Sequence, residues 1–212
     1  MRTGLSKAAI VQAALDVLNE LGMDGVTVRA VARRLGVQAP ALYWHVKDKQ
    51  ELLDEMGTEI WRRASQEMLA LRSDIAWRER LAAYATIVRH ALLSHRDGAK
   101  AFSGTYLTDV GVLERQESMF TQMGEAGFTL EDTVRAYSLL YSFTVGFCIE
   151  EQAVASAESG DDRYSLDRRA ERLDAERYPR VVASGSYIFG DPDARFADLI
   201  DVIIGSIARM KS

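Results

Sequence analysis

Residues 38–41 carry three side chains that suit contact with the edges of DNA bases. The amide group of Gln38 can form two hydrogen bonds with adenine in the major groove. Pro40 and Ala41 can make apolar contact with the methyl group of thymine. This chemistry would read sequence if a helix carries the three residues into the groove.

The neighbouring residues carry groups that suit contact with DNA phosphates. Tyr43 and His45 can donate hydrogen bonds, and Lys47 and Lys49 can neutralise phosphate charge. Arg29 can reach either a phosphate or the edge of a guanine. The stretch therefore combines groups that position a protein on DNA with groups that read its bases.

Each of these residues also has a purely structural interpretation. Trp44 and Tyr43 could cover a core, Gln38 could be an ordinary residue at a helix start, and His45 could lie at a solvated helix end. It is their combination in one short stretch that favours DNA binding.

Three short helices are expected to position this stretch. Ser6 can cap the first helix, which Gly22 ends, and Thr27 can cap the second. Gly36 allows a tight turn before a third helix over residues 38–45. Three short helices with a turn of a few residues between the last two predict a helix-turn-helix.

The charge distribution agrees with that prediction. The chain has a net charge of -5, but residues 1–50 carry +3 and the remainder carries −8. A basic head on an acidic body is typical of a DNA-binding head, although chance fluctuation over fifty residues is an open alternative.

The rest of the chain is predicted to be helical, with no internal repeat. Apolar residues recur at helical spacing, and the stretch from Ala136 to Ile149 is apolar nearly all round, which is typical of a helix buried on several sides. We expect an all-α fold of nine or ten helices. The predicted later helices cover residues 48–71, 76–94, 112–123, 130–155, 166–184 (ended or kinked by Pro179) and 192–210, with irregular segments at 96–111 and 156–165.

Several classes of protein are not expected. The chain has no glycine-rich phosphate loop, and His45, His90 and His95 do not share a helical face at metal-ligand spacing, so we predict neither an enzyme nor a metal or cofactor site. Cys148 is the only cysteine, and we find no signal peptide and no membrane-spanning stretch. The expected location is the cytoplasm, with no membrane partner.

Two runs in the head resemble the tetracycline repressor (TetR) family, closest to the tetracycline-repressor branch. They are TVRAVARRLGV at residues 27–37 and ALYWHVKDKQELL at residues 41–53. The resemblance extends to RDGAK at 96–100, Gly104-Thr105 and FTVG at 143–146 with Glu150. It implies a DNA-binding domain at 1–47, a connector helix at 48–72, and a ligand-binding and dimerisation domain at 73–212.

The resemblance also implies which residues touch the operator. This chain departs from the family pattern at Val28, Ala39 and Ala41, so its base preference is expected to differ. The predicted DNA-contacting residues are Thr27, Arg29, Gln38, Ala39, Pro40, Ala41, Tyr43, Trp44, His45 and Lys49.

A homodimer is a further implication of the resemblance. Residues 130–155 and 192–210 would form a four-helix bundle with their counterparts, although both helices could instead bury their faces within one subunit. Two heads on a two-fold axis would meet successive major grooves roughly 34–36 Å apart, which predicts a pseudo-palindromic operator.

The effector site is expected to differ from that of tetracycline-binding relatives. Where those relatives have a metal-binding histidine this chain has Phe102, although Thr105 and Glu150 remain. The resemblance therefore implies an effector other than magnesium–tetracycline. Other polar positions of those relatives fall at Ser65, Tyr84, Val88 and Ser118.

An apolar, aromatic pocket is expected instead, formed by Phe102, Tyr106, Tyr84, Val88 and Phe147. The alternative is that these residues are simply core and that no cavity exists. The overall prediction is a DNA-binding repressor released by a small-molecule effector. The alternatives are a DNA-binding regulator that responds to no ligand, and an activator.

Overall fold

The protein is all-helical, as the sequence predicts. The computed structural model describes residues 5–158 and 166–211, and within these ranges it contains no strand. The helices are α1 (Lys7–Gly25), α2 (Val28–Leu35), α3 (Ala39–Leu42), α4 (Lys49–Leu69), α5 (Trp77–Leu93), α6 (Gly98–Phe102), α7 (Val110–Glu125), α8 (Leu130–Glu158), α9 (Leu166–Arg172), α10 (Pro179–Ile188) and α11 (Pro192–Ile207).

Side-chain caps and glycines set the helix ends in the head. Ser6 Oγ accepts a hydrogen bond from Ala9 N at 3.2 Å, and Thr27 Oγ1 accepts one from Ala30 N at 3.1 Å. Gly36 ends α2 in the left-handed region, at φ 67°, which a glycine adopts without strain. α2 and α3 therefore follow each other closely, as a helix-turn-helix requires.

Two expectations about the helices were wrong. The segment 96–111, expected to be irregular, contains the short helix α6. Residues 166–184 are interrupted, as the presence of Pro179 predicts: α9 ends at Arg172, and Pro179 begins α10 at a position where its missing N–H costs nothing. The structure thus has eleven helices in the described ranges, where nine or ten were expected.

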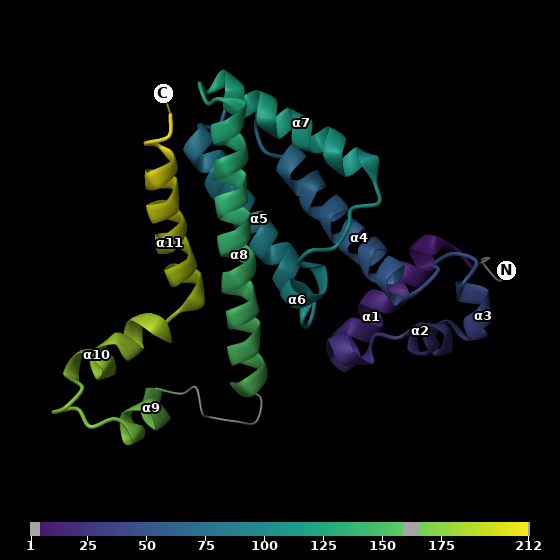
Figure 1. The fold of residues 1–212 in the computed structure, drawn as a ribbon, viewed down its shortest axis with the longest axis horizontal. Coiled ribbons are helices and arrows are strands. Elements are labelled where there is room, and N and C mark those ends of the chain that lie inside the picture. Colours follow the sequence, from purple (N-terminus) through teal and green to yellow (C-terminus); the bar gives the residue numbers. More distant parts are fainter. Residues whose placement is uncertain (1–4, 159–165, 212) are drawn as a thin grey trace.

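The head, α1–α3, lies at one end of the molecule, and α4 leads from it into the body (Figure 1). In the body α5 packs against α4, α6, α8 and α11, while α7 packs against α4 and α8. α9 and α10 pack on each other at the far end of the molecule, away from the head (Figure 1). This order makes α4 the helix that connects the DNA-facing end to the centre of the body.

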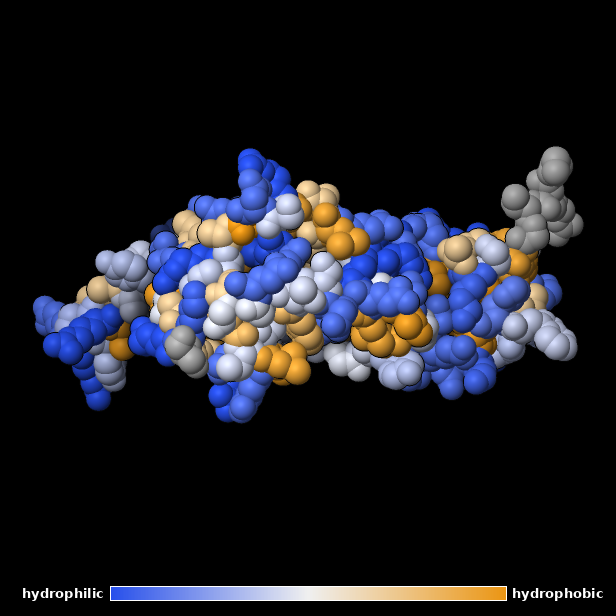
Figure 2. Space-filling model, turned by 90° about the horizontal axis from the view of Figure 1, so that it is seen from above, coloured by the Kyte–Doolittle hydropathy of each residue, from blue (hydrophilic) through white to orange (hydrophobic). Residues whose placement is uncertain are grey.

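The surface is mixed in character. On the face drawn in Figure 2, hydrophilic residues predominate and apolar ones form small separate patches. Within the described ranges, no helix is both long and apolar enough to cross a membrane.

Candidate nucleic-acid interface and ligand pocket

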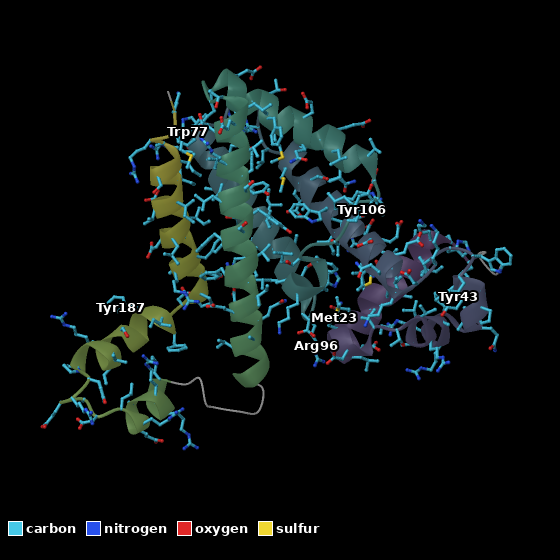
Figure 3. The ribbon with its side chains drawn as sticks, in the orientation of Figure 1. Met23, Tyr43, Trp77, Arg96, Tyr106 and Tyr187 are labelled. Atoms are coloured by element: carbon cyan, nitrogen blue, oxygen red, sulfur yellow. The ribbon has the colours of Figure 1, made fainter. Side chains whose placement is uncertain are left out.

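The ten predicted DNA contacts all lie on the surface of the head, exposed or half-buried. Trp44 is 89% exposed and Tyr43 is also exposed, so neither side chain covers the core of the head. Figure 3 places Tyr43 at the outer end of the head, far from the body. Leu42 and Val46 are the residues of this stretch that are buried, and both belong to the hydrophobic core.

The end of the DNA-facing segment is held by α4. Asp48 caps α4 by accepting a hydrogen bond from Glu51 N at 2.9 Å. Glu51 Oε2 in turn accepts one from Lys47 N at 2.7 Å. These reciprocal bonds fix the backbone between Lys47 and Lys49, while both lysine side chains remain exposed.

A network of hydrogen bonds joins the head to the body. Asn19 Oδ1 lies 3.0 Å from His95 Nδ1 and accepts a hydrogen bond from Arg96 N at 3.2 Å. Asp97 Oδ2 accepts one from Met23 N at 3.0 Å. Figure 3 shows Met23 and Arg96 at this junction. Because Asn19 Oδ1 can only accept, His95 must carry its proton on Nδ1 when it is neutral.

We expect His95 to make the stability of the protein depend on pH. Burial lowers the pKa of His95, and the charge of Arg63 lowers it further, against the opposing effect of Asp16. The unfolded chain therefore binds this proton at a higher pH than the folded chain. The stabilisation that neutral His95 contributes is complete above about pH 6.5, and it is lost as the pH falls through the pKa of His95 in the folded chain.

The measurement is urea unfolding at about pH 7.5 and about pH 5.5, which lie on either side of the ordinary histidine pKa. The wild-type chain should lose more unfolding free energy on acidification than the variant His95→Gln. The exposed His90 provides the matched control, since His90→Gln should behave as wild type. Equal losses in wild type and His95→Gln would contradict the prediction.

The body contains a cavity of about 420 Å³ between α4, α5, α7 and α8. Of the nine predicted effector residues, four line it: Ser65, Tyr84, Thr105 and Ser118. The lining also includes residues that sequence reasoning did not select: Trp61, Met68, Arg80, Arg115, Met119, Phe120, Tyr137 and Tyr141.

The other five predicted effector residues lie elsewhere. Val88 and Phe102 are buried in the core and do not line the cavity. Phe147 packs against Phe196, with ring centroids 5.1 Å apart. Tyr106 is 75% exposed, and Glu150 is exposed on α8.

Phe102 is core because α6 turns its ring inward. It is 1% exposed, and its ring lies edge-on to that of His95 at 6.0 Å. The extra helix α6, which the sequence pattern did not reveal, is the physical reason for this placement.

Two of the missed residues left a signal in the sequence. Arg80 stands four residues before Tyr84 on α5, and Arg115 stands four residues before Met119 on α7. Residues four apart share a helix face, so Arg80 faces the same way as the predicted pocket residue Tyr84, and Arg115 faces the same way as Met119, which the structure places in the cavity lining.

A divalent metal does not fit the cavity. None of the residues lining it is Asp, Glu or His. In the described ranges there is also no group of three or more His, Cys, Asp or Glu residues that could hold a metal ion. Magnesium prefers carboxylate and carbonyl oxygen ligands, so this lining offers it no charged partner.

A helix-turn-helix head with exposed base- and phosphate-binding side chains, joined to a body that holds a cavity, defines a DNA-binding transcriptional regulator. Comparison with known families gives the same result. Residues 10–56 match the family described as bacterial regulatory proteins, tetR family, and residues 72–210 match the tetracyclin repressor-like C-terminal domain. The chain belongs to the TetR family.

Individual relatives agree over nearly the whole chain. The class C tetracycline repressor of Escherichia coli is 34% identical, covering 98% of this chain and 92% of the relative. A possible TetR family regulator from Streptomyces coelicolor A3(2) has a crystal structure that superposes with a TM-score of 0.84 at 34% identity, covering 96% of this chain and 99% of that one. A tetracycline repressor variant from Acinetobacter baumannii AYE, solved with minocycline, gives a TM-score of 0.75 at 30% identity, covering 99% of both chains.

These matches confirm the predicted family and fold. The family consists of transcriptional regulators and not of enzymes, so the protein is a regulator.

Proposed function

We propose that the protein is a repressor that binds a pseudo-palindromic operator as a homodimer and leaves it when a small molecule occupies the cavity. The observation that carries the proposal is the course of α4. Its first residue is the DNA-facing Lys49, and further along it supplies Trp61 and Ser65 to the cavity. One helix thus touches both sites.

The proposed mechanism is a shift between two conformations. A ligand that binds more tightly when α4 is displaced would favour a dimer whose heads are wrongly spaced for successive major grooves. A hundredfold loss of DNA occupancy requires about 2.8 kcal/mol of coupling, which is within the usual range for two linked sites. The junction of Asn19 with His95 and Arg96 would hold the head to the body during this motion.

The outer face formed by α8 and α11 supports the proposed homodimer. Leu139 on α8 and Leu199 and Val202 on α11 are exposed in the single chain. On α8, Ser142 and Gly146 are exposed small residues, which allow a facing helix to approach closely. Two copies of this face would form a four-helix bundle and cover its apolar residues.

The division of the chain follows from the same proposal. Residues 1–47 would bind DNA, 48–72 would connect, and 73–212 would bind the ligand and dimerise. Glu150 is exposed on α8 and does not line the cavity of its own chain. In this proposal, Glu150 would influence the effector response across the dimer.

The proposed effector is not magnesium–tetracycline. The lining has neither His nor carboxylate, and Phe102 faces the core. Minocycline is bound by the Acinetobacter baumannii relative, and the proposal does not extend that ligand to this chain.

The test is selection of bound duplexes from a random DNA library, followed by a screen for molecules that release the selected duplex. Enrichment of a two-fold symmetric site and its release by a molecule that binds the cavity are expected. Enrichment without release by any cavity ligand would favour a regulator that responds to no ligand. No enrichment from folded protein would overturn the proposal.

Lys49 is expected to bind a phosphate. Lys49→Ala should weaken binding to all duplexes about equally. It should also reduce the magnitude of the slope of log affinity against log salt by about 1.8, which is about 0.9 for each of the two copies of Lys49 in the proposed dimer. The matched control is Lys100→Ala, because Lys100 is an exposed lysine on α6 in the body. An unchanged slope for Lys49→Ala would remove this residue from the interface.

A further inference from the structure

The cavity carries positive charge and no negative charge, which restricts what can occupy it. We propose that its ligand is a flat aromatic organic anion, bound through Arg80, Arg115 and the hydroxyl of Tyr137 without a divalent metal ion. The inference rests on the proposed function only in taking this cavity as the effector site.

Arg80 supplies the first positive charge. It is 8% exposed on α5, and its Nη2 donates to the carbonyl oxygens of Ser73 at 3.1 Å and Arg72 at 3.4 Å. These carbonyls fix the guanidinium but do not cancel its charge. No carboxylate of the described residues lies within ion-pair distance of Arg80. A charge this buried is costly unless a counter-charge reaches it.

Arg115 supplies the second positive charge of the cavity. Its Nε donates to Ser65 Oγ at 2.7 Å, which aims the guanidinium from α7 toward α4. Its Nη2 is buried and has no hydrogen-bond partner among the described residues. The charge of Arg115 helps to lower the pKa of Asp109, but that carboxylate is already bound by Arg62 Nε and by Gly111 N, each at 2.9 Å. Arg115 therefore keeps a donor for a ligand.

Tyr137 adds a neutral donor. The residue is 5% exposed, and its hydroxyl is buried without a hydrogen-bond partner in the described part of the chain. Burial raises the pKa of Tyr137 to about 12, so the hydroxyl keeps its proton at neutral pH. Arg80 lines the same cavity as Tyr137, and its charge acts on the pKa of Tyr137 in the opposite direction.

These groups share one requirement. A buried guanidinium N–H and a buried hydroxyl both need an acceptor, and an anion satisfies them while offsetting the charge. Guanidinium groups match the planar oxygens of carboxylates particularly well.

The remaining walls favour a flat apolar skeleton. Trp61 and Tyr141 lie with ring centroids 5.6 Å apart, and Phe120 lies 5.9 Å from the ring of Tyr137. Aromatic walls with a few converging polar groups are typical of sites for drug-sized ligands, which range over about 300–1,000 Å³. Aromatic ligands stack on such rings or meet them edge-on.

The experiment uses two probes with the same aromatic skeleton, of which only one carries an anionic sulfonate group. They are 8-anilinonaphthalene-1-sulfonate and the uncharged N-phenyl-1-naphthylamine, measured by equilibrium dialysis with and without EDTA. We expect the sulfonate to bind the full-length protein at least about tenfold more tightly, as one charge-assisted hydrogen bond provides. EDTA should change neither affinity. Equal affinities, or loss of sulfonate binding in EDTA, would overturn the proposal.

Arg115→Gln tests the contact itself. It should lower the affinity for the sulfonate about tenfold and leave that for the neutral amine unchanged. Arg80→Gln should do the same if it folds, and because Arg80 also holds the loop before α5, Arg115→Gln is the decisive variant. The control is Arg78→Gln, an exposed arginine on α5. Unchanged sulfonate binding in Arg115→Gln would overturn the assignment.

Release of DNA is measured separately, on a duplex selected from the random library. Charge-selective binding that fails to release DNA would contradict the proposed effector control while supporting the ligand chemistry. Release of DNA by the neutral amine alone would support the proposed control of DNA binding by an effector and would overturn the proposed ligand chemistry.

Discussion

Replacing Val202 by glutamate should produce a folded monomer whose affinity for a two-fold operator is lower by at least about a hundredfold. Val202 is 66% exposed on α11, so the charge costs the single chain little. In the proposed dimer, however, two copies of the residue would lie in an apolar interface near a two-fold axis. Each buried carboxylate would then lack a counter-charge. A monomer loses the second head, and with it the gain from simultaneous binding.

Sedimentation equilibrium, circular dichroism and operator binding would together test this. Val181→Glu is the matched control, because Val181 is an exposed valine on α10, away from the outer face of α8 and α11 (Figure 1). It should stay dimeric. A Val202→Glu protein that is still a dimer would place the interface elsewhere.

Phe102→Ala should lower the free energy of unfolding by about 3–5 kcal/mol. The ring of Phe102 is fully enclosed, and its removal leaves a void that the short helix α6 has little freedom to fill. The neighbouring Gly98 shows how tight this region is, since a Cβ at Gly98 would meet Leu92 O at 2.2 Å. Urea unfolding followed by circular dichroism provides the measurement.

The control for this loss is Tyr187→Ala. Tyr187 is a large exposed aromatic residue on α10, and its removal should change stability by no more than about 0.5 kcal/mol. A loss below about 1 kcal/mol for Phe102→Ala would mean that the site collapses around the smaller side chain. Phe102→His should not create tetracycline binding, because the imidazole would be enclosed in the core.

The head could be predicted closely because its signals are local. Ser6 and Thr27 bond to backbone N–H groups three residues away, and Gly36 supplies a backbone conformation that other residues avoid. Such signals lie within one turn of the chain and can be read from residue types. The exposure of Trp44 depends on tertiary packing. The sequence therefore left open the alternative that this side chain covers the core of the head.

The pocket could be predicted only in part because it depends on four helices at once. Tyr84 and Ser65 face it, but the sequence pattern could not show that α6 turns Phe102 into the core. Helical spacing places Arg80 on one face with Tyr84 and Arg115 on one face with Met119. It could not by itself show that these faces turn inward, because an arginine in an amphipathic helix is usually on the solvated side. Tertiary packing decided these positions.

The placement of the three tryptophans has a practical consequence. Trp44 stands at the outer surface of the head, Trp61 lines the cavity, and Trp77 packs against Phe128 at 5.0 Å in the body. Each indole therefore experiences a different event: contact with DNA, entry of a ligand, or loosening of the fold. Variants that each keep one of the three tryptophans would report these three events separately through intrinsic fluorescence, without any added label.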